Sequence, residues 1–270
     1  MAPWKAGVSV FFSRNPHERA ALAQQKMAIV GCGSIGSALA DMLVRAGVGS
    51  LTLIDPELLK IENTGRHVLT RSDVGQPKAE ALARRLLEVN PELRVEPRQE
   101  NFQDADGLLI CCADSRRCGS MVNAVSLTKR LPGVFVAAYG AVHAGEIQFC
   151  VPGSTACREC FASFRRIRNV PPRGDQYTDP DFDETRNPAQ TGLWGSIQVV
   201  SGVAFHVILA PLGFRGRLDL DRSPWIVNLD YEGFQPYAVT FAHVQRGCAV
   251  CDESKVAELP VDDSLARMMP

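Results

Sequence analysis

The sequence predicts an α/β fold, with a doubly wound, mostly parallel sheet that carries helices on both faces. Short apolar segments alternate with amphipathic segments of helical period, and the stretch GCGSIGS at 31–37 separates the first apolar segment from the first helical one. Strands that alternate with helices pair in parallel and are covered from both sides. With 270 residues, 46% of them hydrophobic, the chain is long enough to bury a sizeable core.

The expected elements follow in order from residue 27. They are a strand (27–30), the glycine loop, a helix (37–48), a strand (50–55), a helix (79–90), strands (94–99 and 107–113), a helix after Asp114, and strands (133–140 and 145–151). Residues 163–190 are rich in Pro, Arg and Asp and lack periodicity, which predicts a long exposed loop. The apolar segment 197–214 predicts a buried helix, and late strands are expected near 225–231 and 237–244.

This pattern divides the chain into three parts. Residues 1–26 are expected to form an N-terminal arm and helix, residues 27–251 a single domain that includes the loop 163–190, and residues 252–270 a polar tail. No stretch between 27 and 251 has the composition of a linker between two domains.

The composition argues against several classes of partner and location. Lys plus Arg (29) nearly balance Asp plus Glu (30), so no net field favours nucleic acid or a membrane surface. The N-terminus lacks the long apolar segment and cleavage site of a secretory signal, which predicts a cytoplasmic protein. The segment 197–214 contains Pro211 and several polar residues and is expected to be too short to span a bilayer.

The glycine loop and the acid that follows it predict a nucleotide site. Gly31, Gly33 and Gly36 form G-x-G-x-x-G between a strand and a helix, where backbone N–H groups stabilise phosphate in Rossmann-like folds. Asp55 ends the next strand, where a carboxylate can accept hydrogen bonds from ribose hydroxyls. NAD and ATP both carry a ribose, so this motif leaves the nucleotide open. The alternative is that the glycines only permit a tight turn.

The residues after Asp55 favour a polyphosphate. Asn63, Arg66 and Lys78 follow within reach of the same strand end. A leaving pyrophosphate gathers negative charge that Arg and Lys neutralise in the transition state, whereas a dinucleotide's diphosphate can be held by backbone donors. The alternative is that these cations are ordinary surface residues.

Together with CCADS around Asp114, these motifs resemble the ThiF/MoeB/HesA family of ubiquitin-activating-enzyme-like adenylyltransferases. The resemblance runs in order from about residue 10 to residue 251, and the GRH at 65–67 is similar to that of bacterial members. It implies that the domain 27–251 is an adenylation domain. Such an enzyme uses ATP to adenylate the C-terminal carboxylate of a ubiquitin-like or sulfur-carrier protein and releases pyrophosphate.

The resemblance also implies roles for individual residues. Asp55 would bind the ribose, Asn63, Arg66 and Lys78 the triphosphate, and Asp114 a Mg2+ ion. Mg2+ is commonly held by one or two carboxylates together with phosphate oxygens, so a single aspartate is adequate. The alternative for Asp114 is that it caps the following helix.

Two further features follow from the family pattern. Family members lend an arginine across a dimer interface, so a homodimer is expected, with Arg14 as the candidate arginine and Arg19 second. The sequence departs from the pattern at His67, where many members have Gln, and at Ser115, where an Asn commonly follows the metal-binding Asp.

Four cysteines form two C-x-x-C pairs, Cys157 with Cys160 and Cys248 with Cys251. Four thiolates at this spacing are typical of a tetrahedral, structural Zn2+ site, and the resemblance includes these pairs. We therefore predict a zinc knuckle that ties the start of the long crossover loop to the end of the domain. The alternative is a thioredoxin-like redox pair.

The other five cysteines are Cys32, Cys111, Cys112, Cys118 and Cys150. Many relatives form a thioester or persulfide on a cysteine in the crossover loop, but residues 161–247 contain no cysteine, which predicts adenylation without a thioester there. Cys118 follows two arginines near a helix start, where the pKa of a thiol would fall. The remaining four are expected to be small buried apolar residues.

Alternative functions stay open at this stage. An NAD(P)-dependent oxidoreductase would use the same glycine loop, and a non-catalytic scaffold would bind a carrier protein without turning over ATP. Within the adenylating class, a peptide-modifying or tRNA-modifying enzyme is a further alternative.

Overall fold

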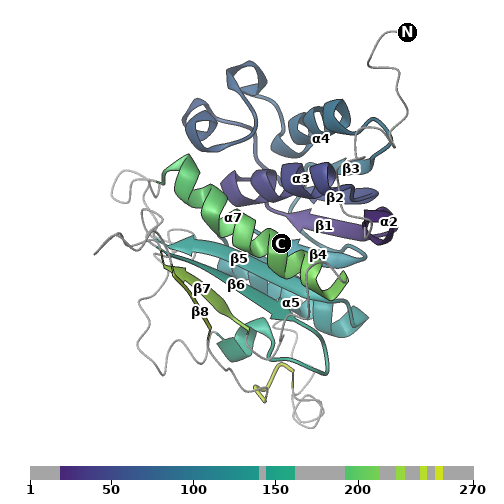
Figure 1. Ribbon diagram of the computed structural model, residues 1–270, viewed down its shortest axis with the longest axis vertical. Helices are drawn as coiled ribbons and strands as arrows, with labels where there is room; N and C mark the ends of the chain where they lie inside the picture. The colour runs from purple at the N-terminus through teal and green to yellow at the C-terminus, as the bar shows by residue number, and fades with distance from the viewer. Residues whose placement is uncertain are drawn as a thin grey trace.

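The computed structural model describes residues 19–139, 144–161, 192–212, 223–228, 238–241 and 247–251. The expected α/β fold is confirmed (Figure 1). Its elements are α2 (Arg19–Leu22), β1 (Lys26–Val30), α3 (Ser34–Ala46), β2 (Ser50–Ile54), the 3-10 turns η2 (Ile61–Arg66) and η3 (Arg71–Asp73), α4 (Lys78–Val89), β3 (Arg94–Arg98), β4 (Leu108–Cys111), α5 (Arg116–Lys129), β5 (Gly133–Tyr139), β6 (Ala144–Cys150), α7 (Trp194–Leu209), η5 (Ala210–Leu212), β7 (Trp225–Asn228) and β8 (Ala238–Phe241). The loop 163–190, the tail 252–270 and most of the arm 1–26 lie outside the described residues.

The strands form one sheet in the order β3-β2-β1-β4-β5-β6-β7-β8. The first five are parallel, because helices or long connections separate them in the sequence. β6 instead pairs antiparallel with β5, which it follows after only a short connection, and β7 and β8 continue the antiparallel pairing. The parallel half therefore carries the helices that the sequence pattern predicts.

Helices cover both faces of the sheet, as Figure 1 shows, and each face has its own apolar core. On one face α3, α4 and α7 cover the side chains that include Ile29 of β1 and Leu53 of β2. On the other face α5 covers the alternate residues, including Val30 of β1 and Ile54 of β2. This alternation is the two-residue period of a strand, so strands covered on both faces are apolar at almost every position.

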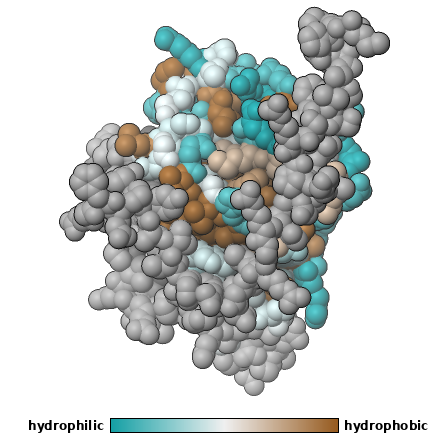
Figure 2. Space-filling model, viewed as in Figure 1, coloured by the Kyte–Doolittle hydropathy of each residue, from teal (hydrophilic) through white to brown (hydrophobic). Residues whose placement is uncertain are grey.

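The helix α7 is the apolar helix expected at 197–214, displaced by three residues at its start. It packs against α3, β5 and β6, and apolar surface follows its course in Figure 2. The expectation that this segment is too short for a bilayer is wrong on length, since Trp194–Leu212 is long and apolar enough by length and composition alone. A helix in the core of a domain passes the same test, and α7 lies in the larger core of this one.

The chain changes direction across the sheet between β1 and β4. From β1 it proceeds to β2 and β3 on one side, and from β4 it proceeds to β5 on the other. In open α/β sheets the loops that leave the two strands at such a point diverge, and ligands bind in the crevice outside their carboxyl ends. The glycine loop follows β1 and Asp114 follows β4, so both lie at this point of the fold.

Two of the three glycines in the loop should differ sharply in their tolerance of a side chain. A Cβ at Gly36 would overlap the carbonyl oxygen of Gly31, whereas a Cβ at Gly33 would meet nothing within 4 Å. We expect Gly36→Ala to lower the free energy of unfolding by about 1–3 kcal/mol or to prevent folding. Gly33→Ala should change it by less than about 1 kcal/mol, because the φ of Gly33 is −74° and suits alanine. Urea unfolding of both variants measures this, and equal effects would contradict the described packing.

Candidate functional site

Three predicted site segments meet at the carboxyl edge of the parallel strands. Val30 at the end of β1 pairs with Ile54 of β2 and with Cys111 of β4. The residues that follow these three strand ends are therefore neighbours. The Gly31 N–H donates to the Ile54 carbonyl at 2.8 Å, and the Cys112 N–H donates to the Val30 carbonyl at 2.8 Å.

The glycine loop lies directly against the loop after β4. Gly31 has a φ of +90°, and a Cβ there would lie 2.7 Å from the backbone nitrogen of Ala113. Only glycine combines that backbone conformation with so close an approach. Gly36 allows the first turn of α3 to pack on the Gly31 carbonyl, while open space surrounds Gly33. The loop thus presents the N-terminus of a 13-residue helix to that space, which is where anions bind in such folds.

Asp55 holds the glycine loop as well as facing the site. Its Oδ2 accepts the Cys32 N–H at 2.7 Å, and its Oδ1 accepts the Glu57 N–H at 2.8 Å. Burial raises the pKa of Asp55, although both backbone donors and the nearby charge of Lys78 oppose the shift. Each carboxylate oxygen has a second lone pair for another donor, so the predicted ribose contact remains compatible with this arrangement.

Lys78 is the buried cation of the site. It begins α4, its side chain is only 7% exposed, and its ammonium group pairs with the carboxylate of Glu57, which is 56% exposed. The Lys78 N–H also donates to the Glu57 carbonyl at 3.0 Å. The sequence offers no signal for Glu57, because an exposed glutamate after a strand is unremarkable. Because Glu57 is exposed, water can solvate its carboxylate when the pair with Lys78 separates.

The other two predicted triphosphate ligands lie on η2. Arg66 is half-buried at the last residue of this turn. Asn63 turns its side chain back to its own segment, where Oδ1 accepts the Lys60 N–H at 3.0 Å. In this arrangement Asn63 caps the turn that carries Arg66, and a direct role at the triphosphate stays a prediction. Arg14 lies outside the described residues.

His67 is a site residue whose contacts the sequence did not reveal. The residue is 8% exposed, Nδ1 accepts the Leu69 N–H at 3.0 Å, and Nε2 lies 2.7 Å from the Cys32 carbonyl oxygen. Since Nδ1 is an acceptor, the proton is on Nε2, which donates to that carbonyl. Burial lowers the pKa of His67 to about 4, so the ring is neutral near pH 7.

Asp114 stands exposed between β4 and α5, one residue beyond the backbone that Gly31 touches. The alternative that Asp114 caps α5 is wrong. The N-cap is Ser115, whose Oγ accepts the Cys118 N–H at 3.3 Å. The departure from the family pattern at Ser115 therefore has a structural use, because the serine hydroxyl caps the helix.

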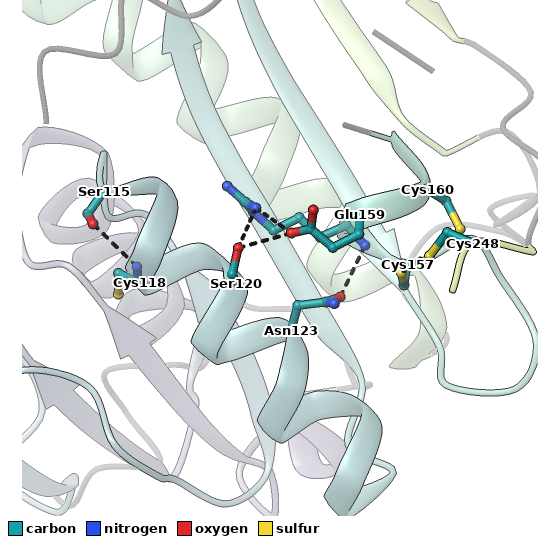
Figure 3. A network of polar contacts seen from close by, with 9 residues as sticks. Ser115, Cys118, Ser120, Asn123, Cys157, Glu159, Cys160 and Cys248 are labelled. Carbon is teal, nitrogen blue, oxygen red and sulfur yellow. Dashed lines mark hydrogen bonds and ion pairs between the residues drawn. The ribbon is translucent and has the colours of Figure 1, made fainter. Parts of the chain in front are cut away.

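The four paired cysteines converge as predicted, and three of them, Cys157, Cys160 and Cys248, are drawn in Figure 3. All four Sγ atoms lie within 4.8 Å of one another, and four of the separations are 3.9, 3.6, 3.4 and 3.8 Å. Zn–S bonds of about 2.3 Å in a tetrahedron place sulfurs about 3.8 Å apart. The donor set and its spacing therefore fit a structural Zn2+ ion, and four sulfur ligands leave no position for a substrate.

The two residues between the first pair of cysteines anchor the knuckle on α5 (Figure 3). The Arg158 N–H donates to Asn123 Oδ1 at 3.1 Å, and the Ser120 hydroxyl donates to Glu159 Oε1 at 3.0 Å. The Arg158 guanidinium also donates to Glu159 at 3.0 Å and lies 5.9 Å from the centre of the Phe135 ring. The sequence analysis did not predict these contacts. Their only sign in the sequence is that two charged residues, Arg158 and Glu159, lie between the first two paired cysteines.

The five remaining cysteines are buried or partly buried. Cys32, Cys111, Cys112 and Cys150 are buried, as expected. The expectation of a lowered pKa at Cys118 is wrong, because a hydrogen bond with Cys111 and burial raise the pKa of this thiol. Arg158 nearby favours the thiolate but does not offset the burial.

The neutral state of His67 should make stability depend on pH. Its folded pKa of about 4 lies below its ordinary value of 6.5, so between these values the unfolded chain binds more protons. The free energy of unfolding therefore decreases as the pH is lowered through this window. His67 accounts for a decrease of about 2 kcal/mol between pH 7 and pH 5. Urea unfolding at both pH values should show that loss in the wild type and not in His67→Gln. Identical pH dependence in the two proteins would contradict a buried neutral ring.

Loss of one cysteine of the knuckle should release zinc and destabilise the domain. We expect Cys160→Ser to bind almost no zinc and to unfold at a lower temperature, because the ion fastens segments far apart in the sequence. Cys118→Ser is the matched control, because Cys118 is partly buried and lies outside the four-cysteine cluster. Atomic emission and thermal unfolding measure both effects. Full zinc content in Cys160→Ser would refute the four-cysteine site.

Comparisons with known proteins agree with this arrangement. Ubiquitin-like modifier-activating enzyme 5 of Drosophila persimilis is 31% identical over 159 residues, which cover 52% of this chain and 41% of that protein. The same enzyme of Drosophila virilis is 30% identical over 172 residues, covering 56% and 43%. The matches thus span less than half the length of these curated relatives.

Solved structures share the fold. E. coli MccB with ATP superposes with a TM-score of 0.69 at 20% identity, covering 87% of this chain and 68% of that one. PaaA superposes with a TM-score of 0.64 at 21% identity, covering 86% and 78%. The ThiF family model matches residues 10–218, which include the glycine loop, Asp55, Lys78 and Asp114. The chain therefore belongs to the ThiF family.

Proposed function

We propose that this protein is an ATP- and Mg2+-dependent adenylyltransferase that activates the C-terminal carboxylate of a ubiquitin-like or sulfur-carrier protein. The observation that carries the proposal is the meeting, at one edge of the sheet, of an open glycine loop, a buried lysine and an exposed aspartate. Membership of the ThiF family and likeness to ubiquitin-like modifier-activating enzymes support it. E. coli MccB, which shares the fold, is solved with ATP.

Each group has a distinct task in this reaction. Backbone N–H groups at the start of α3 bind phosphate beside Gly33, and Asp55 accepts hydrogen bonds from the ribose. Asp114 would hold Mg2+, which supplies positive charge at the phosphates. Lys78 and Arg66 neutralise the charge that develops on the pyrophosphate. Lys78 is suited to this because its buried ammonium can exchange the exposed Glu57 carboxylate for a phosphate oxygen.

The chemistry itself is a displacement at phosphorus. A carboxylate oxygen of the carrier's C-terminus forms a bond to the α-phosphorus, and the bond from this phosphorus to the bridging oxygen breaks. Pyrophosphate leaves with the electron pair, and the products are an acyl-AMP and pyrophosphate. Most of the rate enhancement comes from positioning and from charge stabilisation, since no protein atom is joined to the substrate.

The fate of the acyl-AMP follows from the distribution of cysteines. Residues 161–247 contain none, so the next acceptor attacks the adenylate directly, without a thioester in the crossover loop. The proposal also includes a homodimer in which Arg14 reaches the partner's site. A peptide C-terminus is the second candidate substrate, because MccB is solved with N-formylated MccA.

The proposal is tested by ATP–pyrophosphate exchange in the presence of a small carrier protein that ends in Gly-Gly. Lys78→Ala should reduce exchange by about a hundredfold or more, because a buried cation aimed at developing charge is lost. Gly33→Ala should fold normally yet reduce exchange, because its methyl group enters the phosphate space. Lys129→Ala is the control, since Lys129 pairs on the surface with Asp104 and Asp106. Exchange that is unaffected by Lys78→Ala and Gly33→Ala would refute the proposed site.

A further inference from the structure

His67 makes no contact that the proposed reaction uses, yet it is buried against the glycine loop. It is bonded at both ring nitrogens, to Leu69 on one side and to Cys32 on the other. Burial, with help from the charge of Lys78, lowers the pKa of His67 to about 4, against the opposing effects of the hydrogen bond with Cys32 and the charge of Asp73. The ring thus keeps one donor and one acceptor, as its two backbone partners require.

The backbone of Cys32 is hydrogen-bonded to a side chain on each side. Its N–H donates to Asp55 Oδ2 at 2.7 Å, and its carbonyl oxygen lies 2.7 Å from Nε2 of His67. Both partners come from the segment that follows β2. The middle of the glycine loop is therefore held on its donor side and on its acceptor side by two side chains that lie 12 positions apart in the sequence.

The second of these bonds sets the direction of the next N–H group. A trans peptide is planar, and its C=O and N–H point in opposite directions. With the Cys32 carbonyl directed at His67, the Gly33 N–H must point away from His67. No described residue accepts a hydrogen bond from that N–H, and a Cβ at Gly33 would meet nothing within 4 Å. A backbone N–H group that has no partner among the described residues, at the start of a helix, can donate a hydrogen bond to an anion.

We propose that His67 is a positioning residue that holds the Cys32–Gly33 peptide so that the Gly33 N–H donates to a phosphate oxygen of bound ATP. The inference rests on the proposed function, since it assumes that the loop binds a nucleotide. It assigns the imidazole a task that differs from that of Asp55. Asp55 is placed to contact both the loop and the ribose, whereas His67 acts on the ligand only through the peptide that it turns.

The inference is tested by comparing His67→Leu with His67→Gln. Leucine has no donor for the Cys32 carbonyl, whereas the side-chain amide of glutamine can donate to it and can accept from Leu69. We expect His67→Leu to weaken ATP binding, measured by calorimetry with Mg2+, by about tenfold or more, and His67→Gln to stay within about threefold of the wild type. Leu69→Ala is the matched control, because it removes buried volume from the same segment and keeps the His67 contacts.

A second measurement reports on the peptide itself. In protein labelled with 15N-glycine, the amide resonance of Gly33 is identified by its absence in Gly33→Ala. ATP should shift this resonance in the wild type and in His67→Gln, and should leave it nearly unchanged in His67→Leu. General loss of stability would not produce this pattern. If His67→Leu does not fold, a Gly33 amide that ATP leaves unshifted in the wild type still overturns the inference, and so does a loss of ATP binding in a folded His67→Gln.

The outcomes separate the two proposals. If the wild type binds no ATP, the proposed function is overturned and this inference with it. If the wild type binds ATP but the Gly33 amide does not shift, the function stands and the inference is overturned. The inference is also overturned if His67→Leu binds ATP as the wild type does, or if His67→Gln is as weak as His67→Leu.

Discussion

The close approach of backbone to backbone at the carboxyl edge of the sheet is the constraint on which the candidate site depends. Gly31 touches Ala113, and Gly36 lets α3 settle on the Gly31 carbonyl. Without side chains at these positions, the loop after β1 and the loop after β4 lie in contact, and the start of α3 is brought to the edge. A lysine, an aspartate and a helix N-terminus can then act on one ligand.

Buried and hydrogen-bonded polar groups beside this loop favour a single loop conformation. Asp55 and His67 are both nearly inaccessible to solvent, and each is bonded at both of its polar side-chain atoms to backbone groups. Buried polar groups cost free energy unless they are paired, so each bond also favours the single loop conformation that satisfies it. Lys78 differs, because its partner Glu57 is exposed and regains water when the pair separates.

The four-cysteine knuckle, whose donor set fits a structural Zn2+ ion, is joined to the candidate site through α5. Arg158 and Glu159 connect the knuckle to Ser120 and Asn123, on the helix that begins directly after Asp114 and Ser115. An ion held there would fasten residues 157–160 to residues 248–251 and would also fix the helix whose first turn borders the candidate nucleotide site. Metal binding at the knuckle would thus be coupled to the geometry of the candidate site through one helix.

The sequence by itself determined the order of the elements, the position of the glycine loop and the four zinc cysteines. These features depend on spacing within short segments: two-residue and 3.6-residue periods, G-x-G-x-x-G and C-x-x-C. Only the tertiary structure decided that β6 runs antiparallel, that Ser115 and not Asp114 caps α5, and that His67 bonds to Cys32. The last contact joins residues 35 positions apart. Such contacts arise when strands and helices pack, and no local pattern encodes them.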